Sequence, residues 1–101
     1  MGIINFLFKP KSSKIKDFLK RNAIIIDVRT QQEWNDSHIE NAIHIPLKTL
    51  KDKVEAIKKL DKPIIVYCKS GVRSEKAKAI LKSQHIEVVN GGGMDDLKQL
   101  L

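Results

Sequence analysis

The chain has 101 residues, of which 42% are hydrophobic and 31% charged, and its formal net charge is +7. This length and composition are typical of one small globular domain and leave no room for a second independent core. One cysteine excludes an internal disulfide, and no apolar run approaches the roughly 18 residues of a membrane span, so we expect a cytoplasmic protein with no membrane contact.

Positive charge is concentrated at the start of the chain, where six basic residues stand against only Asp17 among the first 22 residues. They are Lys9, Lys11, Lys14, Lys16, Lys20 and Arg21. No aromatic or arginine-rich pattern accompanies them, so we favour a solvated face over a nucleic-acid site. We expect residues 1–23 to form a basic arm and a helix, from Ser12 or Ser13 to near Asn22, that is part of or packed on a domain spanning residues 24–101.

The rest of the chain alternates between short apolar runs and segments of helical periodicity. Strands are expected at 23–28, 42–45, 62–67 and 86–89, helices at 30–38, 50–60, 74–83 and 94–101, and a glycine turn at 91–93. Thr30 and Glu33 fit a capping box at the start of the first of these helices. Such alternation predicts an α/β fold, with a small parallel sheet flanked by helices on both faces and right-handed crossovers.

Cys68 is the most informative residue because of its context. A lone cysteine is usually a small buried hydrophobe. This one ends a buried strand and opens a loop, Lys69-Ser70-Gly71-Val72-Arg73, that leads into a helix. Its sulfur should therefore face a helix N-terminus and a ring of backbone N–H groups, which lower a thiol pKa and stabilise anions. We expect Cys68 to be partly thiolate near neutral pH.

Other loop residues have roles that follow from their chemistry. Lys69 and Arg73 supply positive charge at the two ends of the loop, and Gly71 permits backbone angles that a Cβ hinders. The hydroxyls of Ser70 and Ser74 are candidates either to donate to a bound anion or to cap the following helix. No cofactor is expected, and no metal site either, because His38, His44 and His85 lack partner cysteines at ligand spacing.

Three segments carry a family resemblance. The segment Tyr67–Ser74 is similar to the active-site loop of the rhodanese family, the thiosulfate and related sulfurtransferases. The residues Ile26–Arg29, Glu33-Trp34 and 38–46 resemble its N-terminal signature, and Val89–Met94 resembles its C-terminal one. The three occur in the right order over about residues 24–101. Asn41 stands where the family often has glycine, and asparagine can keep the left-handed turn.

The resemblance implies a rhodanese-like fold and a mechanism in two steps. Cys68 takes sulfane sulfur from a small anionic donor such as thiosulfate, holds it as a persulfide, and passes it to cyanide or a thiol acceptor. Substrate binding falls to the loop, whose amides cradle the persulfide. Lys69 binds the anionic donor, and Arg73 also holds the loop in shape. Residues of the substrate-binding set are Lys69, Ser70, Gly71, Val72 and Arg73.

Residues outside the loop are assigned mainly to support. Asp27, Arg29 and Glu33 match family positions at the carboxyl edge of the sheet, where we expect them to pair with each other or with Arg73. We class Ser74 with them. For His38 we favour a structural hydrogen bond over a role as general base, and for Trp34 a packing role.

Several other functions compete with sulfur transfer. A phosphatase or arsenate reductase of related fold has one more residue between cysteine and arginine than the four found here, and an internally resolved arsenate cycle needs a second cysteine. A catalytically silent binding module usually lacks the cysteine. A sulfur relay to a protein acceptor differs only in its last step, and the basic arm is a candidate docking segment for that acceptor.

Overall fold

The computed structural model describes residues 11–101 and has one four-stranded sheet. The residues 1–10, with the first part of the expected basic arm, lie outside the described residues. The strands are β1 (Ile24–Asp27), β2 (Ile43–His44), β3 (Ile64–Cys68) and β4 (Val88–Gly93). Their order is β2-β1-β3-β4 and every pair is parallel, which confirms the predicted small parallel sheet.

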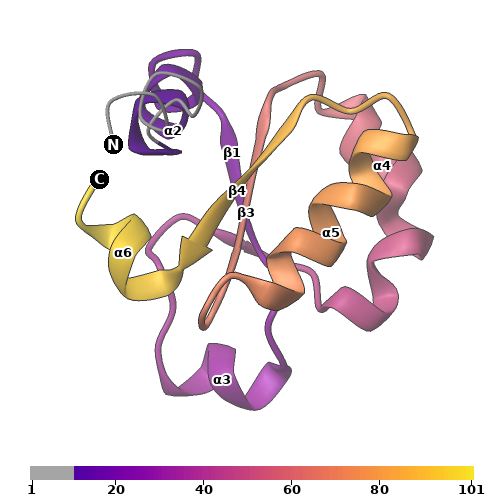
Figure 1. The fold of residues 1–101 in the computed structure, drawn as a ribbon. Coiled ribbons are helices and arrows are strands. Elements are labelled where there is room, and N and C mark those ends of the chain that lie inside the picture. Colours follow the sequence, from indigo (N-terminus) through magenta and orange to yellow (C-terminus); the bar gives the residue numbers. More distant parts are fainter. Residues whose placement is uncertain (1–10) are drawn as a thin grey trace.

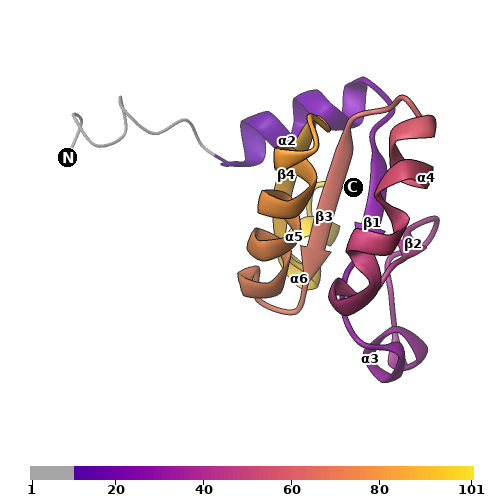
Figure 2. The same ribbon diagram turned by 90° about the vertical axis from the view of Figure 1, so that its right-hand side faces the viewer.

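Helices cover both faces of this sheet, as predicted (Figures 1 and 2). They are α2 (Lys11–Lys20), α3 (Gln31–Asp36), the 3-10 helix η1 (Leu47–Lys53), α4 (Val54–Lys59), α5 (Val72–Ser83) and α6 (Met94–Lys98). One face packs on η1, α4 and α5 through residues such as Leu50, Ile57 and Leu81. The other packs on α2 and α6 through Ile15, Phe18 and Leu97, so α2 shares its core with the sheet.

All four strands deliver their carboxyl ends to one edge of the sheet, and α3 lies at that edge (Figure 1). The central strand β3 is fully buried and ends at Cys68. In an open parallel sheet this edge is where ligands usually bind. The sheet thus brings the segments after β1, β3 and β4 together around the cysteine.

Two expectations about local structure were wrong. Residues 91–93 are not a turn, because they complete β4 beside β3. The helix expected over 50–60 starts earlier, at Leu47, as 3-10 turns that pass into α4 at Val54. Pro46 precedes η1 and its carbonyl accepts the Thr49 N–H at 3.0 Å, which fixes a tighter first turn than apolar spacing reveals.

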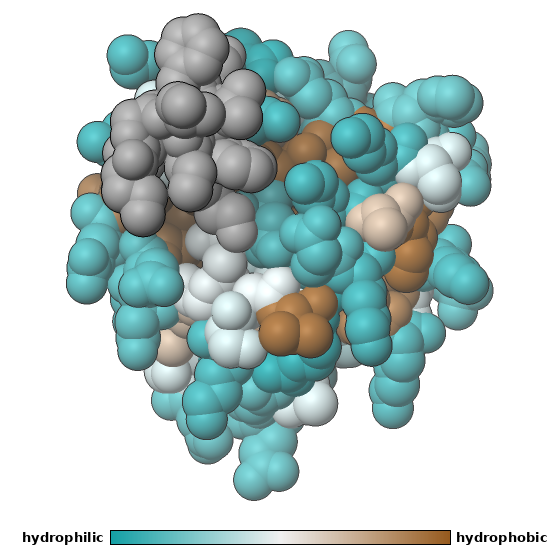
Figure 3. Space-filling model, viewed as in Figure 1, coloured by the Kyte–Doolittle hydropathy of each residue, from teal (hydrophilic) through white to brown (hydrophobic). Residues whose placement is uncertain are grey.

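On the face shown in Figure 3, the described residues are mostly hydrophilic, and hydrophobic residues form small separate patches. Val72 is the most exposed of the large apolar residues described, at 65%. Within residues 11–101, no helix is long and apolar enough to cross a membrane.

Candidate active site

The sulfur of Cys68 is buried at the end of β3 and faces hydrogen-bond donors from the following loop. The Gly71 N–H donates to Sγ at 3.0 Å and the Ser74 N–H at 3.4 Å. The Ser74 hydroxyl oxygen lies 3.3 Å from Sγ. The loop therefore folds back over the cysteine, and its polar hydrogens converge on one sulfur atom.

These donors determine the acidity of the thiol. Burial of the sulfur raises the pKa of Cys68, because a thiolate loses hydration there. The hydroxyl and N–H of Ser74 and the backbone N–H groups of Gly71 and Ser70 stabilise the thiolate and outweigh that effect. The net result is a pKa of the Cys68 thiol below its ordinary value, which favours the nucleophilic form.

Gly71 shapes the loop. It precedes α5 at φ 100°, a left-handed conformation that favours glycine. The N-cap residue Gly71 has no side-chain cap, and the sulfur of Cys68, not a serine hydroxyl, accepts from the Ser74 N–H in the first turn, so the capping role considered for Ser70 and Ser74 is not found. The reason is geometric: α5 begins at Val72, which puts Ser74 inside its first turn, where its hydroxyl faces Cys68 and Asn90.

The glycines of β4 let the loop approach the sheet. A Cβ on Gly93 would collide with the Lys69 carbonyl, and a Cβ on Gly71 would lie 3.3 Å from the Gly92 backbone. Gly93 is therefore required by the close approach of the Lys69 backbone rather than by a turn, whereas the space at Gly92 is open. The Cys68 loop packs against this end of β4.

Arg73 closes the loop through an ion pair with α3. Its Nη1 and Nη2 donate to Oε1 and Oε2 of Glu33 at 2.6 and 2.9 Å. Glu33 also completes the predicted capping box, since the Thr30 side chain accepts from the Glu33 N–H and Glu33 accepts from the Thr30 N–H. Hydrogen bonds from Arg73 and Thr30 lower the pKa of Glu33 to about 2, although partial burial opposes them.

Asp27 and Arg29 form a second, more deeply buried pair at the end of β1. Arg29 Nη2 donates to Asp27 Oδ2 at 2.7 Å and to the Ser37 carbonyl at 2.6 Å. The pair ties the residues after β1 to the end of α3. Asp27, Arg29 and Glu33 therefore make the pairs expected at this edge, with each other or with Arg73.

Three loop residues remain accessible: Lys69, Ser70 and Val72 are exposed. Lys69 makes no ion pair with another described residue, whereas Arg73 and Arg29 are both held by carboxylates. Lys69 is consequently the free cation of the loop.

His38 and Trp34 lie outside the loop. The His38 ring stacks on Trp34 with centroids 3.6 Å apart, and its Nδ1 lies 2.8 Å from the Trp34 carbonyl oxygen. His44 stacks on the same indole at 4.9 Å. The structure thus places His38 in a hydrogen bond and Trp34 in a packed aromatic stack, as expected.

Asn90 belongs to the site but was not singled out from the sequence. It is 3% exposed in β4, and its side chain contacts Ser74, Gly71, Glu75 and Gly92. The available signal was a polar residue that follows the buried pair Val88-Val89 and precedes the glycine run. A buried amide at such a position requires partners, and these come from the Cys68 loop.

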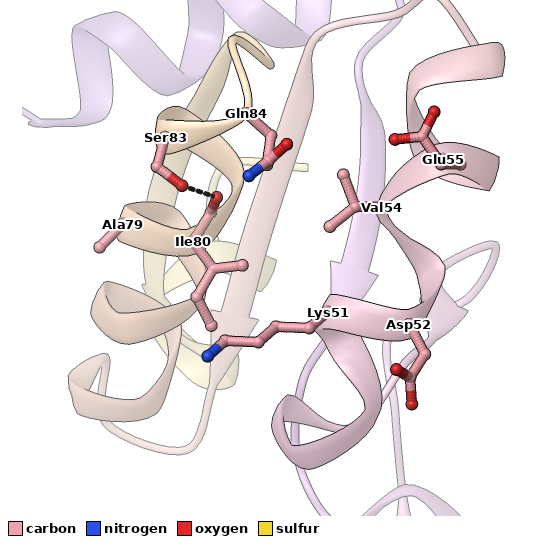
Figure 4. Close-up of a pocket in the computed structure, with 8 residues that line it drawn as sticks. All are labelled: Lys51, Asp52, Val54, Glu55, Ala79, Ile80, Ser83 and Gln84. Carbon is pink, nitrogen blue, oxygen red and sulfur yellow. Dashed lines mark hydrogen bonds between the residues drawn. The ribbon is translucent and has the colours of Figure 1, made fainter.

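Hollows flank the Arg73–Glu33 pair. One of about 250 Å³ is lined in part by Arg29, Glu33 and Lys69, and another of about 500 Å³ in part by Leu47, Lys48 and Arg73. A further hollow of about 670 Å³ lies between η1, α4 and α5, with Val54 and Ile80 in its lining (Figure 4). None of the residues 68–74 lines that third hollow, whereas Lys69 lines the first and Arg73 the second.

Comparison with known proteins agrees with this geometry. A profile of the rhodanese-like domain family matches residues 12–99, from α2 to the end of α6. The chain belongs to the rhodanese-like family. The match begins in α2, before the segment from Ile24 in which the sequence resemblance was recognised.

Among curated relatives of this rhodanese-like domain, the thiosulfate sulfurtransferase PspE of Escherichia coli is 36% identical over 74 residues, 71% of either chain. A tRNA uridine(34) hydroxylase of Salmonella is 35% identical over 86 residues, but this chain spans only 25% of it. The first relative thus resembles the present domain over most of its length, and the second only over one part.

Solved structures show the same fold. A rhodanese from E. coli with anions superposes with a TM-score of 0.67 at 36% identity, covering 73% of this chain and 89% of that one. A rhodanese-like domain protein from Staphylococcus aureus gives a TM-score of 0.71 at 31% identity, covering 85% of this chain and 86% of that one.

Among residues 11–101, no group of three or more His, Cys, Asp or Glu is arranged to hold a metal ion.

Proposed function

We propose that this rhodanese-like domain is a sulfurtransferase that carries sulfane sulfur on Cys68 from thiosulfate, or a similar anionic donor, to cyanide or a thiol. In the first step the Cys68 thiolate attacks the outer sulfur of thiosulfate. The sulfur–sulfur bond of the donor breaks, sulfite leaves with the electron pair, and Cys68 becomes an anionic persulfide.

The convergence of donors on Sγ is the observation that carries this proposal. Gly71 and Ser74 aim N–H groups at the sulfur from 3.0 and 3.4 Å, and these hydrogen bonds lower the pKa of the Cys68 thiol against the effect of burial. A thiolate at the bottom of an N–H-lined loop is a nucleophile beside an anion site. We infer that the same loop holds the negative terminal sulfur of the persulfide.

Charge at the loop supports an anionic donor. Lys69 is exposed and makes no ion pair within residues 11–101, so it is available to attract thiosulfate, whereas the Arg73 guanidinium is engaged by Glu33. We assign donor binding to Lys69 and maintenance of the loop mainly to Arg73. Four residues between Cys68 and Arg73 make a small ring, which suits one sulfur atom better than a tetrahedral oxyanion.

In the second step an acceptor attacks the terminal sulfur and the persulfide bond breaks, returning its electron pair to Cys68. Cyanide yields thiocyanate and a thiol yields a new persulfide. The sulfur itself is buried, but Lys69, Ser70 and Val72 of the loop over it are exposed, so a protein acceptor can contact the loop. We propose a thiol, small or on a protein, as the acceptor in the cell.

Thiocyanate formation from thiosulfate and cyanide tests the proposal. We expect the intact chain to turn over and Cys68→Ser to be inactive while unfolding at a similar temperature. Ser83→Ala, at the far end of α5, serves as the matched control and should keep full activity. Turnover that survives Cys68→Ser, or no turnover in the intact chain, would contradict the assignment.

A further inference from the structure

Both polar atoms of the Asn90 side chain form hydrogen bonds with the Cys68 loop and the residues beside it. Its Oδ1 accepts from the Ser74 hydroxyl at 2.7 Å and from the Gly92 N–H at 2.8 Å. Its Nδ2 donates to the Gly71 carbonyl at 3.0 Å and to Glu75 Oε1 at 2.9 Å. A flipped amide would set its NH₂ against the Gly92 N–H, so the four contacts fix Oδ1 as the acceptor for Ser74.

Ser74 therefore faces two acceptors with a single hydrogen. Its hydroxyl lies 2.7 Å from Asn90 Oδ1 and 3.3 Å from Cys68 Sγ. While Ser74 donates to Asn90, the contact with sulfur is a hydrogen bond only if the thiol donates to Ser74. A thiolate has no hydrogen to give, so the contact between Ser74 and a thiolate is a hydrogen bond only if the Ser74 hydrogen turns toward sulfur and leaves Asn90.

We propose that the Ser74 hydrogen alternates between Asn90 Oδ1 and Cys68 Sγ, and donates to the sulfur only while Sγ carries the negative charge. Ser74 touches the reacting sulfur directly. Asn90 acts through Ser74 and is a positioning residue. Its Oδ1 accepts the Ser74 hydrogen when Sγ carries no negative charge, and competes with Sγ for that hydrogen when Sγ is negatively charged. The place of this exchange in a reaction cycle rests on the proposed sulfurtransferase function.

In that cycle the charge on Sγ changes twice. The thiolate attacks the donor and becomes the neutral inner sulfur of the persulfide, whose charge sits on the terminal sulfur, so the Ser74 hydrogen returns to Asn90. When cyanide attacks the terminal sulfur, the electron pair of the persulfide bond returns to Sγ and thiocyanate leaves. The hydrogen then swings back to stabilise the departing thiolate.

Several charged groups of the described residues lie around this exchange. The Arg73 guanidinium attracts the Cys68 thiolate but is held by Glu33. Glu75 contacts Asn90 on its amide nitrogen, away from Oδ1. Asp27 and Arg29, on the neighbouring strand, are paired with each other. The acceptor strength at position 90 is therefore the variable that sets how tightly the Ser74 hydrogen is held.

A double-mutant cycle separates this exchange from simple support of the loop. Asn90→Asp makes a stronger acceptor and Asn90→Ala removes the acceptor. Each is combined with Ser74 and with Ser74→Ala, and the alkylation rate of Cys68 is measured across pH. Any direct effect of the new side chain, or of a looser loop, occurs in both backgrounds and cancels in the comparison.

The exchange predicts couplings of opposite sign. Asn90→Asp should slow alkylation about threefold more when Ser74 is present than in the Ser74→Ala background. Asn90→Ala should show the opposite coupling. Its effect on the alkylation rate should be more favourable when Ser74 is present than in the Ser74→Ala background, because the Ser74 hydrogen freed from Asn90 can then donate to the thiolate. If Asn90→Asp fails to fold beside Glu75, the Asn90→Ala pair decides alone by its sign, with thermal unfolding confirming that each protein is folded.

The inference would be overturned if each Asn90 replacement changed the alkylation rate by the same factor with Ser74 and with Ser74→Ala. It would also be overturned if the two replacements gave couplings of the same sign. Either result would leave Asn90 as support for the loop only. The measurement uses an alkylating reagent and no sulfur donor. It therefore remains decisive if the chain proves unable to use thiosulfate, and a failure of the exchange leaves the proposed sulfur transfer untouched.

Discussion

Arg73 and Glu33 join the end of the cysteine loop to α3 through two parallel hydrogen bonds of 2.6 and 2.9 Å. Their side chains are 34% and 27% exposed, so the pair is partly screened by solvent. Because Glu33 also belongs to the capping box with Thr30, one carboxylate stabilises both the helix start and the loop end. Its loss should be felt in stability and in the loop together.

Glu33→Gln tests this double role. The substitution removes the charge of the pair and one of its charge-assisted hydrogen bonds, so we expect the free energy of unfolding to fall by about 1 kcal/mol, a value reduced for solvent screening. Glu55→Gln is the control, because Glu55 is 81% exposed and lies 3.7 Å from Lys58. Chemical denaturation measures both, and equal effects of the two substitutions would refute a special role for Glu33.

Acid should weaken the same interaction. Glu33 has a pKa of about 2 in the folded chain, below the roughly 4.3 of an unfolded glutamate. A lowered pKa gives stability that is complete above the unfolded value and is lost as pH falls through the folded one. The stability difference between the intact chain and Glu33→Gln should therefore shrink from about pH 5 to pH 2. A difference that grows on acidification would contradict the ion pair.

Lys69→Ala should weaken the use of thiosulfate through the loss of an exposed positive charge at the loop. We expect the KM for thiosulfate to rise severalfold while transfer from an uncharged persulfide donor changes little. Lys59→Ala on α4 alters the net charge equally and serves as control. Equal losses with both donors would show that Lys69 supports the loop rather than attracting charge.

Gly93→Ala should be more damaging than Gly92→Ala. A Cβ at position 93 would collide with the Lys69 carbonyl, which belongs to the backbone of the loop. At position 92 the space is open and only φ 84° opposes a side chain. We expect Gly93→Ala to destabilise the chain by about 2 kcal/mol and to abolish sulfur transfer, and Gly92→Ala to cost about 1 kcal/mol. Thermal unfolding and turnover measure both variants. If the loop can shift away from position 93, they would instead show Gly92→Ala as the more damaging substitution.

Local signals predicted the parts of the structure that depend on neighbours in the chain. The capping box of Thr30 and Glu33 lies within four residues and is present. Asn41 adopts φ 70°, the left-handed conformation expected of it. The β-branched run that ends at Cys68 is the buried strand β3. Each feature is set by short-range sterics, hydrogen bonding or apolar periodicity, which a single sequence displays.

Features that depend on contacts between segments far apart in the chain could not be predicted from the sequence. Residues 91–93 were expected to form a turn because glycine favours turns, but they lie in β4, where Gly93 admits the Lys69 backbone, which the sequence does not position. Asn90 and Ser74 are 16 residues apart, and the packing of α5 on β4 brings them together. The sequence therefore left the Ser74 hydroxyl as a candidate for a helix cap or for donation to a bound anion, and did not reveal its place between sulfur and an amide.

The most direct test of the central claim, that Cys68 carries sulfur, is the intact mass of the protein after incubation with thiosulfate. We predict the addition of one sulfur atom, its removal by cyanide, and no addition to Cys68→Ser. An unchanged mass, or an adduct that persists when Cys68 is replaced, would contradict the account.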